Sequence, residues 1–297
     1  MENNGDRDYQ SEMRQCQIDV EERLRCFFSG ETSYSGLLEA MRYSLLAGGK
    51  RIRAVMCIKF CEAAGGRLEA ALDAACAIEM LHAYSLIHDD LPCMDNSDTR
   101  RGKPSNHIKF GESTATLAGD ALQAAAFGTL LDSELPPAAI IGMAQAFAHA
   151  AGPHGICGGQ YLDLLGESKI YSSDEVAQTH SLKTAALISA SARIGVVAAG
   201  GSPEQVKAAE EYALAVGLAF QIRDDVLDVT ASEQNLGKPV GSDRENEKNT
   251  FAALMGLDAC EDIIAAETEK AIGALSGKFD NGGFLVWFAR MLSERKY

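Results

Sequence analysis

The sequence has few basic residues for its acidic content. Its 297 residues include 27 Lys and Arg against 42 Asp and Glu, which gives a formal net charge of -15. A protein that binds nucleic acid through a general basic surface needs Lys and Arg in excess to neutralise phosphates, so this composition argues against that class of function. Any phosphate group that the protein binds must therefore meet a local cationic site.

Paired cysteines are also lacking. The eight cysteines include no CxxC pair and no compact framework of the kind that small secreted proteins use, so we expect reduced thiols. Cys57 and Cys61 are four residues apart and could share a helix face. No further ligands with zinc-finger spacing follow them, and buried packing is favoured over a metal site.

No segment looks suited to crossing or reaching a membrane. The charge-free run 135–162 contains three prolines, which leave a helical part too short to span a bilayer, and it is better interpreted as a buried helix. The first ten residues, MENNGDRDYQ, are polar and charged and show no secretory signal or transit peptide. The expected location is therefore cytoplasmic.

Strand-like alternation is almost absent, whereas helical periodicity covers most of the chain. We expect helices over 17–29, 35–46, 51–64, 67–90, 114–133, 138–151, 174–199, 203–229, 249–273 and 281–295. Helix starts are indicated by Ser202 before Pro203 and Gln205, after two glycines, and by a capping box of Ser172 with Glu175. No flexible linker or repeat divides the chain. The prediction is an all-α, single-domain fold over 1–297, with 1–30 as a candidate peripheral helix.

Two clusters of aspartates lie at apolar helices. Asp89 and Asp90 end the predicted helix 67–90, and Asp95 follows beyond Pro92. The second cluster lies 135 positions later, where two aspartates four residues apart share one helix face with a third beside them: Asp224, Asp225 and Asp228. Either cluster alone could be a solvated helix end. Together they suit Mg²⁺, which binds a few carboxylates plus the phosphates of a substrate, and this favours a diphosphate ester.

Basic residues stand at selected places in this acidic chain. Arg100 and Arg101 follow the first aspartate cluster. The stretch AGGKRIR places Lys50, Arg51 and Arg53 directly after a glycine pair, which is a plausible anion site without metal. Lys183 and Lys238 are further candidates. Any single one of these could be an ordinary surface residue, but their combination with the aspartates indicates diphosphate binding.

Five sequence blocks occur in an order that resembles the trans-isoprenyl diphosphate synthases, most closely those of the bacterial farnesyl diphosphate synthase (geranyltranstransferase) type. The blocks are GGKRIR at 48–53, HAYSLIHDDLPCMDNSDTRRGKPSNH at 82–107, GGQYLDL at 158–164, LKT at 182–184, and FQIRDDVLD at 220–228 followed by LGKPVGSD. The resemblance runs from about residue 37 to the C-terminus. Two positions depart from the family pattern, because Ala54 replaces a proline and Ser97 replaces an aspartate.

The resemblance implies an isoprenoid-synthase-type helical bundle around a deep central cavity, with the two aspartate motifs facing each other across its mouth. It implies Mg²⁺, three ions per active site, and a homodimer. The metal ligands would be Asp89, Asp95 and Asp224, supported by Asp90, Asp225 and Asp228. The allylic diphosphate would be held by Arg100, Lys183 and Lys238, and isopentenyl diphosphate by Lys50, Arg53, His82 and Arg101. Thr184 and Gln221 would place oxygen dipoles near the developing cation and complete the catalytic set with Lys183 and Lys238.

The reaction implied is Mg²⁺-dependent head-to-tail prenyl transfer. Isopentenyl diphosphate would condense with dimethylallyl and then geranyl diphosphate to give farnesyl diphosphate and pyrophosphate. Residue chemistry agrees, because metals suit the substrate that loses its diphosphate, whereas Arg and Lys alone suit the one that keeps it.

Product length is expected to depend on Tyr84 and Ser85, which lie five and four residues before Asp89 and one turn deeper along the predicted helix. In relatives of this type an aromatic residue at the Tyr84 position blocks elongation beyond C15. Three alternatives stay open: a geranylgeranyl diphosphate synthase with a C20 product, a class I terpene cyclase, and a non-catalytic subunit of a synthase. The four residues assigned to isopentenyl diphosphate argue against a cyclase, and the intact motifs argue against a non-catalytic subunit.

Overall fold

The computed structural model describes residues 4–236 and 250–295, and nearly all of them are helical, which confirms the all-α prediction. The residues fall into two compact units, one of residues 1–147 with 193–202 and the other of residues 148–192 with 203–297. Each unit is described in turn. The single-domain assignment stays a prediction.

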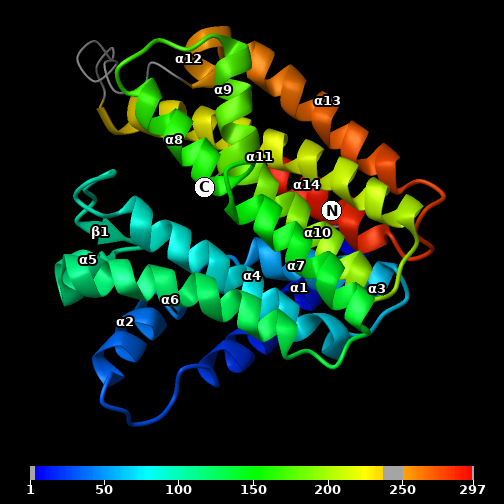
Figure 1. Ribbon diagram of the computed structural model, residues 1–297. Helices are drawn as coiled ribbons and strands as arrows, with labels where there is room; N and C mark the ends of the chain where they lie inside the picture. The colour runs from blue at the N-terminus through cyan, green and yellow to red at the C-terminus, as the bar shows by residue number, and fades with distance from the viewer. Residues whose placement is uncertain (1–3, 237–249, 296–297) are drawn as a thin grey trace. The chain divides into compact units, whose positions relative to one another are not determined.

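The first unit contains the long helix α4, which packs along α6 and against α3. Its elements are α1 (Asn4–Arg25), α2 (Ser35–Leu45), α3 (Ile52–Ala63), α4 (Leu68–Asp89), β1 (Thr99–Arg100), β2 (Lys103–Pro104), α5 (Asn106–Phe110), α6 (Glu112–Leu131) and most of α7 (Pro137–Ala151). The core side chains Phe60, Met80 and Leu81 are fully buried. Because α3 and α4 are apolar around most of their circumference, they form the interior of this unit. Figure 1 shows α4 lying alongside α6.

The second unit is built on α11, which packs along α13. Its elements are α8 (Ile156–Gly166), α9 (Ser173–His180), the π-helical turn η1 (Ser181–Ala185), α10 (Ala186–Ala198, whose last turns belong to the first unit), α11 (Pro203–Leu236), α12 (Phe251–Met255), α13 (Leu257–Leu275) and α14 (Gly283–Ser293). One hydrophobic cluster joins α9, α11, α12 and α13 and includes Ile222, Phe251 and Ile264. Arg223 donates to both carboxylate oxygens of Glu261 at 2.6 Å, which fixes α11 to α13 at the level of the second aspartate motif.

Most predicted helices are confirmed with boundaries shifted by a few residues. The capping box is also confirmed, since Ser172 accepts from the backbone of Glu175 and the Glu175 side chain accepts in return. Helix α11 begins at Pro203 as predicted, but the Gln205 side chain donates to the carbonyl of Lys278.

The sequence-based helix boundaries are wrong at several places. Helix α1 starts at Asn4 rather than 17, and α11 continues beyond 229 to Leu236. A single helix over 249–273 is wrong, because Gly256 at φ 82° separates α12 from α13. The turn η1 interrupts the predicted helix 174–199. Three short or glycine-rich elements were not expected: α5, α8 and the hairpin β1–β2, whose registers pair Thr99 with Pro104 and Arg100 with Lys103.

All eight cysteines are free thiols, and Cys57 and Cys61 are buried in α3, as the packing interpretation predicts. Burial raises the pKa of the Cys61 thiol to about 11 and that of Cys57 well above its ordinary value.

Two helical stretches, Leu68–Asp89 and Ser173–Ala198, are long and apolar enough to cross a membrane by length and composition alone. Most of each stretch is buried inside the structure, as is usual for core helices.

Candidate functional site

The first aspartate motif forms where α4 ends. The Asp95 amide donates to the Asp89 carbonyl at 3.0 Å, and the Ser97 amide donates to the Asp90 carbonyl at 3.2 Å. The loop after Pro92 therefore folds back on the end of the helix and brings the backbone of Asp95 beside that of Asp89. Two of the three residues assigned to Mg²⁺ thus have their backbones close in space although a proline separates them in sequence.

Asp90 has a different environment from its neighbours. Its side chain is buried and accepts from Arg100 through Nε at 3.0 Å and Nη2 at 2.5 Å. This hydrogen bond raises the pKa of Arg100. A carboxylate engaged by a guanidinium in this bidentate way fixes the arginine in one orientation. The structure therefore places Asp90 as the partner that holds Arg100, and its supporting position at a metal stays a prediction.

Arg100 and Arg101 are consecutive but have different partners. Arg100 belongs to strand β1 and reaches Asp90, whereas Arg101 is at the tip of the hairpin with φ 54°, followed by Gly102 with φ 72°. Two residues with positive φ are typical of a tight hairpin turn. Because the turn reverses the chain, the Arg101 guanidinium contacts the carbonyl of Gly48 instead. The hairpin thus directs the side chains of two consecutive arginines to different partners.

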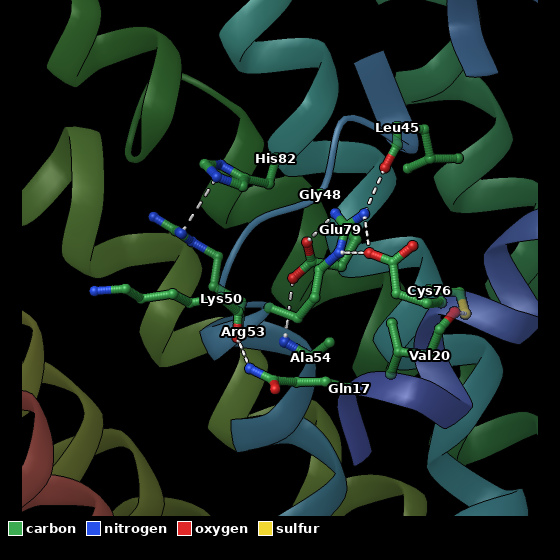
Figure 2. Close-up of polar contacts among 12 residues, drawn as sticks. Gln17, Val20, Leu45, Gly48, Lys50, Arg53, Ala54, Cys76, Glu79 and His82 are labelled. Carbon is green, nitrogen blue, oxygen red and sulfur yellow. Dashed lines mark hydrogen bonds and ion pairs between the residues drawn. The ribbon is translucent and has the colours of Figure 1, made fainter. Parts of the chain in front are cut away.

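The loop between α2 and α3 lies beside Arg101 and carries Lys50. Lys50, Arg53, His82 and Arg101 are together called the cationic pocket below. Gly49 has φ 121°, and a Cβ there would lie 2.7 Å from Nη1 of Arg101. Glycine is needed at this position both for the backbone angle and for the close approach of the arginine. Arg53, in the first turn of α3, lies with Nη1 3.5 Å from Nε2 of His82 (Figure 2).

The electrostatics of this pocket favour an anion. Burial and the neighbouring Arg101 lower the pKa of Arg53 against the opposing effect of Glu79, and burial and nearby arginines lower the pKa of Arg101. Burial and the same cations lower the pKa of His82 well below its ordinary value, so His82 is neutral at neutral pH. Among the described residues none accepts a hydrogen bond from the buried Nε of Arg53. Arg53 and Arg101 repel each other, and the Nε of Arg53 is a donor without an acceptor in the described part of the chain. Both features are suited to binding a diphosphate.

Arg51 does not belong to this pocket, although the sequence grouped it with Lys50 and Arg53 as an anion site. Its side chain is buried and bonds to Glu79 at 2.9 Å, to Glu21 at 2.6 Å and to the carbonyl of Leu45 at 2.7 Å. With φ 49° it begins α3 in the left-handed region. Arg51 is therefore neutralised within the protein, and the anion site is reduced to Lys50 and Arg53 with His82 and Arg101.

Lys183 is in the π-helical turn η1 of the second unit. Its Nζ donates to Asp163 of α8 at 2.7 Å. The two elements approach so closely that a Cβ on Gly159 would lie 2.2 Å from the Lys183 backbone nitrogen. The extra residue of a π-turn bulges the backbone and is frequent at functional sites. Gly159 and Asp163, both from the block GGQYLDL, thus hold Lys183 in place.

Thr184 and Gln221 are brought together as an oxygen-rich pair. The Thr184 hydroxyl donates to Oε1 of Gln221 at 3.2 Å, which joins η1 to α11.

The second aspartate motif lies one turn later on α11. Asp224 forms an ion pair with Arg295 from the C-terminal end of the described chain. Asp225 is buried and accepts from the backbone amide of Phe251 at 2.9 Å, so it anchors α12. The side chain of Asp228 and the whole of Lys238 lie outside the described residues.

Tyr84 and Ser85 lie on α4, one turn before Asp89. Tyr84 is 5% exposed, and its ring packs edge-on against His88 at 5.6 Å between centroids. His88 in turn contacts the carbonyl of Thr116 on α6 at 3.0 Å. Ser85 is half-buried and donates to the carbonyl of His82 within the helix. The Tyr84 ring is thus fixed by packing within the first unit.

The donor chemistry of the aspartates fits Mg²⁺. Asp89 and Asp95 are hard oxygen ligands placed together at one helix end, and Asp224 offers another. Within residues 4–236 and 250–295, no three His, Cys, Asp or Glu side chains form a complete metal-binding group. That is compatible with Mg²⁺, which usually keeps waters and takes one or two carboxylates plus substrate phosphates.

Several residues of the candidate site were missed by the sequence analysis. Asp163 lies four residues after Gly159, so their shared helix face was a signal that could have been used. The sequence contained no signal for Glu79 or Arg295, because neither a glutamate inside an apolar helix nor an arginine near the C-terminus belongs to a recognisable motif. That the two aspartate motifs face each other across a deep cavity stays a prediction.

Comparisons with known proteins agree on one family. The sequence model of the family described as polyprenyl synthetase matches residues 35–278. The chain is 42% identical to farnesyl diphosphate synthase of Geobacillus stearothermophilus over 88% of this chain and 89% of that protein. It is 47% identical to the chloroplastic geranylgeranyl pyrophosphate synthase 7 of Arabidopsis thaliana, over 87% and 76%. Among solved structures, an apo FPP/GFPP synthase from Zymomonas mobilis superposes with a TM-score of 0.87 at 34% identity, covering 97% of this chain and 99% of that one.

Proposed function

Because the chain belongs to the polyprenyl synthetase family and is an isoprenyl diphosphate synthase, a transferase that elongates prenyl diphosphates, we propose that its product is farnesyl diphosphate. It would condense isopentenyl diphosphate with dimethylallyl diphosphate and then with geranyl diphosphate. The observation that carries the C15 product is the fixed, buried ring of Tyr84 one turn before Asp89.

The isopentenyl diphosphate site is the pocket of Lys50, Arg53, His82 and Arg101. Its positive charge, and the buried Nε of Arg53 that no described residue uses as a donor, support binding of a diphosphate without metal. This substrate keeps its diphosphate throughout the reaction, so binding of the diphosphate by cationic side chains without metal ions is sufficient.

The allylic diphosphate is the leaving group and needs stronger stabilisation. Arg100, Lys183 and Lys238 would bind it together with three Mg²⁺ ions, which Asp89, Asp95 and Asp224 would hold with support from Asp90, Asp225 and Asp228. Bound Mg²⁺ supplies the positive charge that neutralises the diphosphate as it departs. Thr184 and Gln221 direct oxygen dipoles toward the allylic carbons, and the apolar helices exclude water. We also propose a homodimer located in the cytoplasm.

The product length follows from the direction of the prenyl tail. A tail whose diphosphate lies at Asp89 runs back along α4, and the first bulky side chain one turn deeper is Tyr84. A ring fixed against His88 cannot rotate away at low cost, because packed cores resist displacement of a large side chain. Growth therefore stops when the tail reaches the ring.

A geranylgeranyl diphosphate synthase is the second candidate. It is favoured by the 47% identity to a plant enzyme of that name, which exceeds the 42% identity to the bacterial farnesyl diphosphate synthase. The two candidates share every diphosphate-binding and metal-binding residue and differ in product length alone.

The test is product analysis with purified protein, Mg²⁺, isopentenyl diphosphate and each of three primers, dimethylallyl, geranyl and farnesyl diphosphate. We expect C15 from the two short primers and no extension of farnesyl diphosphate. Dominant C20 would transfer the assignment to the second candidate, and no condensation by folded protein would overturn both.

The Tyr84→Ala variant tests the residue directly. We expect it to shift the main product toward C20, because truncation of the ring leaves space for one more isoprene unit. The measurement is the C20 to C15 ratio by mass spectrometry, with Tyr84→Phe as the control that keeps the ring and the C15 product. An unchanged C15 product in Tyr84→Ala would contradict this role.

A further inference from the structure

Helix α1 lies before the residues matched by the family, yet it contacts the loop that carries Lys50. The Gln17 side chain donates from Nε2 to the Lys50 carbonyl at 2.7 Å (Figure 2). The Glu21 carboxylate lies 2.6 Å from Nη2 of Arg51. Gln17 and Glu21 are one turn apart, so one face of α1 holds two consecutive residues of the loop.

Glu79 of α4 holds the same loop from the interior. Its Oε2 pairs with Nη1 of Arg51 at 2.9 Å, and its Oε1 accepts from the backbone amide of Ala54 at 3.3 Å. The amide of Ala54 lies in the first turn of α3, where amides have no partner inside the helix. Ala54 stands where the family usually has proline, which has no N–H to donate. This chain therefore has a contact at the base of the loop that a proline could not make.

The loop needs such support for two reasons. It follows Gly48 and Gly49, which both have positive φ and fix the backbone weakly. It also carries Lys50 and Arg53 into a pocket that already contains Arg101, so cations repel one another before an anion binds. Glu21 and Glu79 lie behind the loop, on either side of Arg51. Their two negative charges exceed the single positive charge of Arg51. They stabilise the pocket cations without occupying the anion site.

We propose that α1 is a positioning element for the isopentenyl diphosphate loop, with Gln17 and Glu21 acting as positioning residues through the Lys50 carbonyl and Arg51. The proposal rests on the proposed function of the Lys50, Arg53, His82 and Arg101 pocket. Neither residue touches the substrate. Both determine how the end of the loop next to α3 is oriented before the substrate arrives, and so reduce the ordering that binding requires.

A general stabilising role of α1 is the alternative, and the structure provides variants that separate the two. Helix α1 also docks through Glu12, which bonds to Lys59 at 2.9 Å, and through Arg23, which bonds to Asp73 at 2.6 Å. These two ion pairs join α1 to α3 and α4 and make no bond to residues 48–53. Removing them weakens docking and leaves the loop contacts in place.

The experiment compares isosteric variants. Gln17→Met removes the donor to Lys50 and keeps a good helix former, Glu21→Gln removes the charge facing Arg51, and the double variant removes both. Glu12→Gln and Asp73→Asn are the matched controls. Binding is measured by calorimetry with the analogue isopentenyl S-thiolodiphosphate in buffer that contains EDTA and no allylic primer, so that no condensation occurs. Thermal unfolding and the KM values for both substrates are measured alongside.

We expect about threefold weaker binding of the analogue in each single variant and about tenfold in the double variant, with the KM for the allylic diphosphate changed less than about twofold. The controls should lower the melting temperature and leave analogue affinity within about twofold. Equal affinity of the wild type and the double variant, or equal losses in the controls, would overturn the proposal. Failure of the wild type to bind the analogue would instead overturn the proposed function of the pocket.

Discussion

Two neighbouring arginines, Arg100 and Arg101, have side chains that bind different partners. Arg100 is held by Asp90 through a bidentate contact, and Arg101 contacts the Gly48 carbonyl beside the Lys50 loop. A strand residue and a turn residue point in different directions, so the hairpin β1–β2 separates their guanidinium groups. We therefore expect each arginine to affect one substrate.

Lysine substitutions test this division. Lysine keeps the charge but loses the planar fork of donors, so Arg→Lys is not a conservative change at such sites. We expect Arg100→Lys to raise the KM for geranyl diphosphate about tenfold with little effect on isopentenyl diphosphate, and Arg101→Lys to do the reverse. Steady-state kinetics with each substrate varied in turn would check this. Equal effects of both variants on both substrates would contradict the assignment.

At the scale of elements, the contact between α8 and η1 places Lys183, the lysine proposed to act in catalysis. Gly159 allows the two backbones to approach, and Asp163 one turn later pairs with Lys183. The contact is a property of both elements, because neither the glycine nor the π-turn alone would bring Lys183 to Asp163.

Gly159→Ala should disrupt this contact. The added Cβ would lie 2.2 Å from the Lys183 nitrogen and 2.5 Å from its Cα, so α8 and η1 must separate. Overpacking of this kind costs about 1–3 kcal/mol, and we expect a lower melting temperature with a fall in kcat of at least about tenfold. Gly273→Ala on α13 is the control, since its Cβ would meet nothing within 4 Å among the described residues and alanine favours a helix. A kcat for Gly159→Ala equal to that of the control would contradict the argument.

At the scale of the whole molecule, each unit contains a histidine that folding keeps neutral. Burial and neighbouring arginines lower the pKa of His82 well below 6.5 in the first unit. In the second unit, burial lowers the pKa of His180 to about 4, and its ring stacks on Phe251 at 5.6 Å. Since an unfolded histidine titrates near 6.5, the unfolded chain binds these protons first as the pH falls.

The stability of the protein should therefore be fully present above about pH 6.5 and decline as the pH falls from 6.5 toward 4. The slope from His180 alone is at most about 1.4 kcal/mol per pH unit. We expect His180→Gln to flatten this decline, whereas His149→Gln on the exposed side of α7 should leave it unchanged. Urea unfolding at half-unit pH steps measures the effect. Parallel stability curves for the wild type and His180→Gln would contradict it.

Much of the site could be predicted from the sequence because its chemistry depends on residue type and spacing. Aspartates at the ends of apolar helices, a glycine pair before Lys50 and Arg53, and Arg100 with Arg101 after the first motif all have local signatures. The helical class followed equally well, since the 3.6-residue apolar period is a property of the sequence alone. Helix ends were less accurate, because capping and breaks such as the one at Gly256 depend on tertiary contacts.

Sequence by itself determined the all-α class and the reduced cysteines, and it predicted a set of diphosphate-binding residues, because each depends on composition or short-range order. Only the tertiary structure decided which charges serve the fold. It placed Arg51 between Glu21 and Glu79, Asp90 on Arg100 and Asp225 on the Phe251 amide. The reason is physical: a buried charge must be neutralised by a partner far away in sequence, and only packing brings the two together.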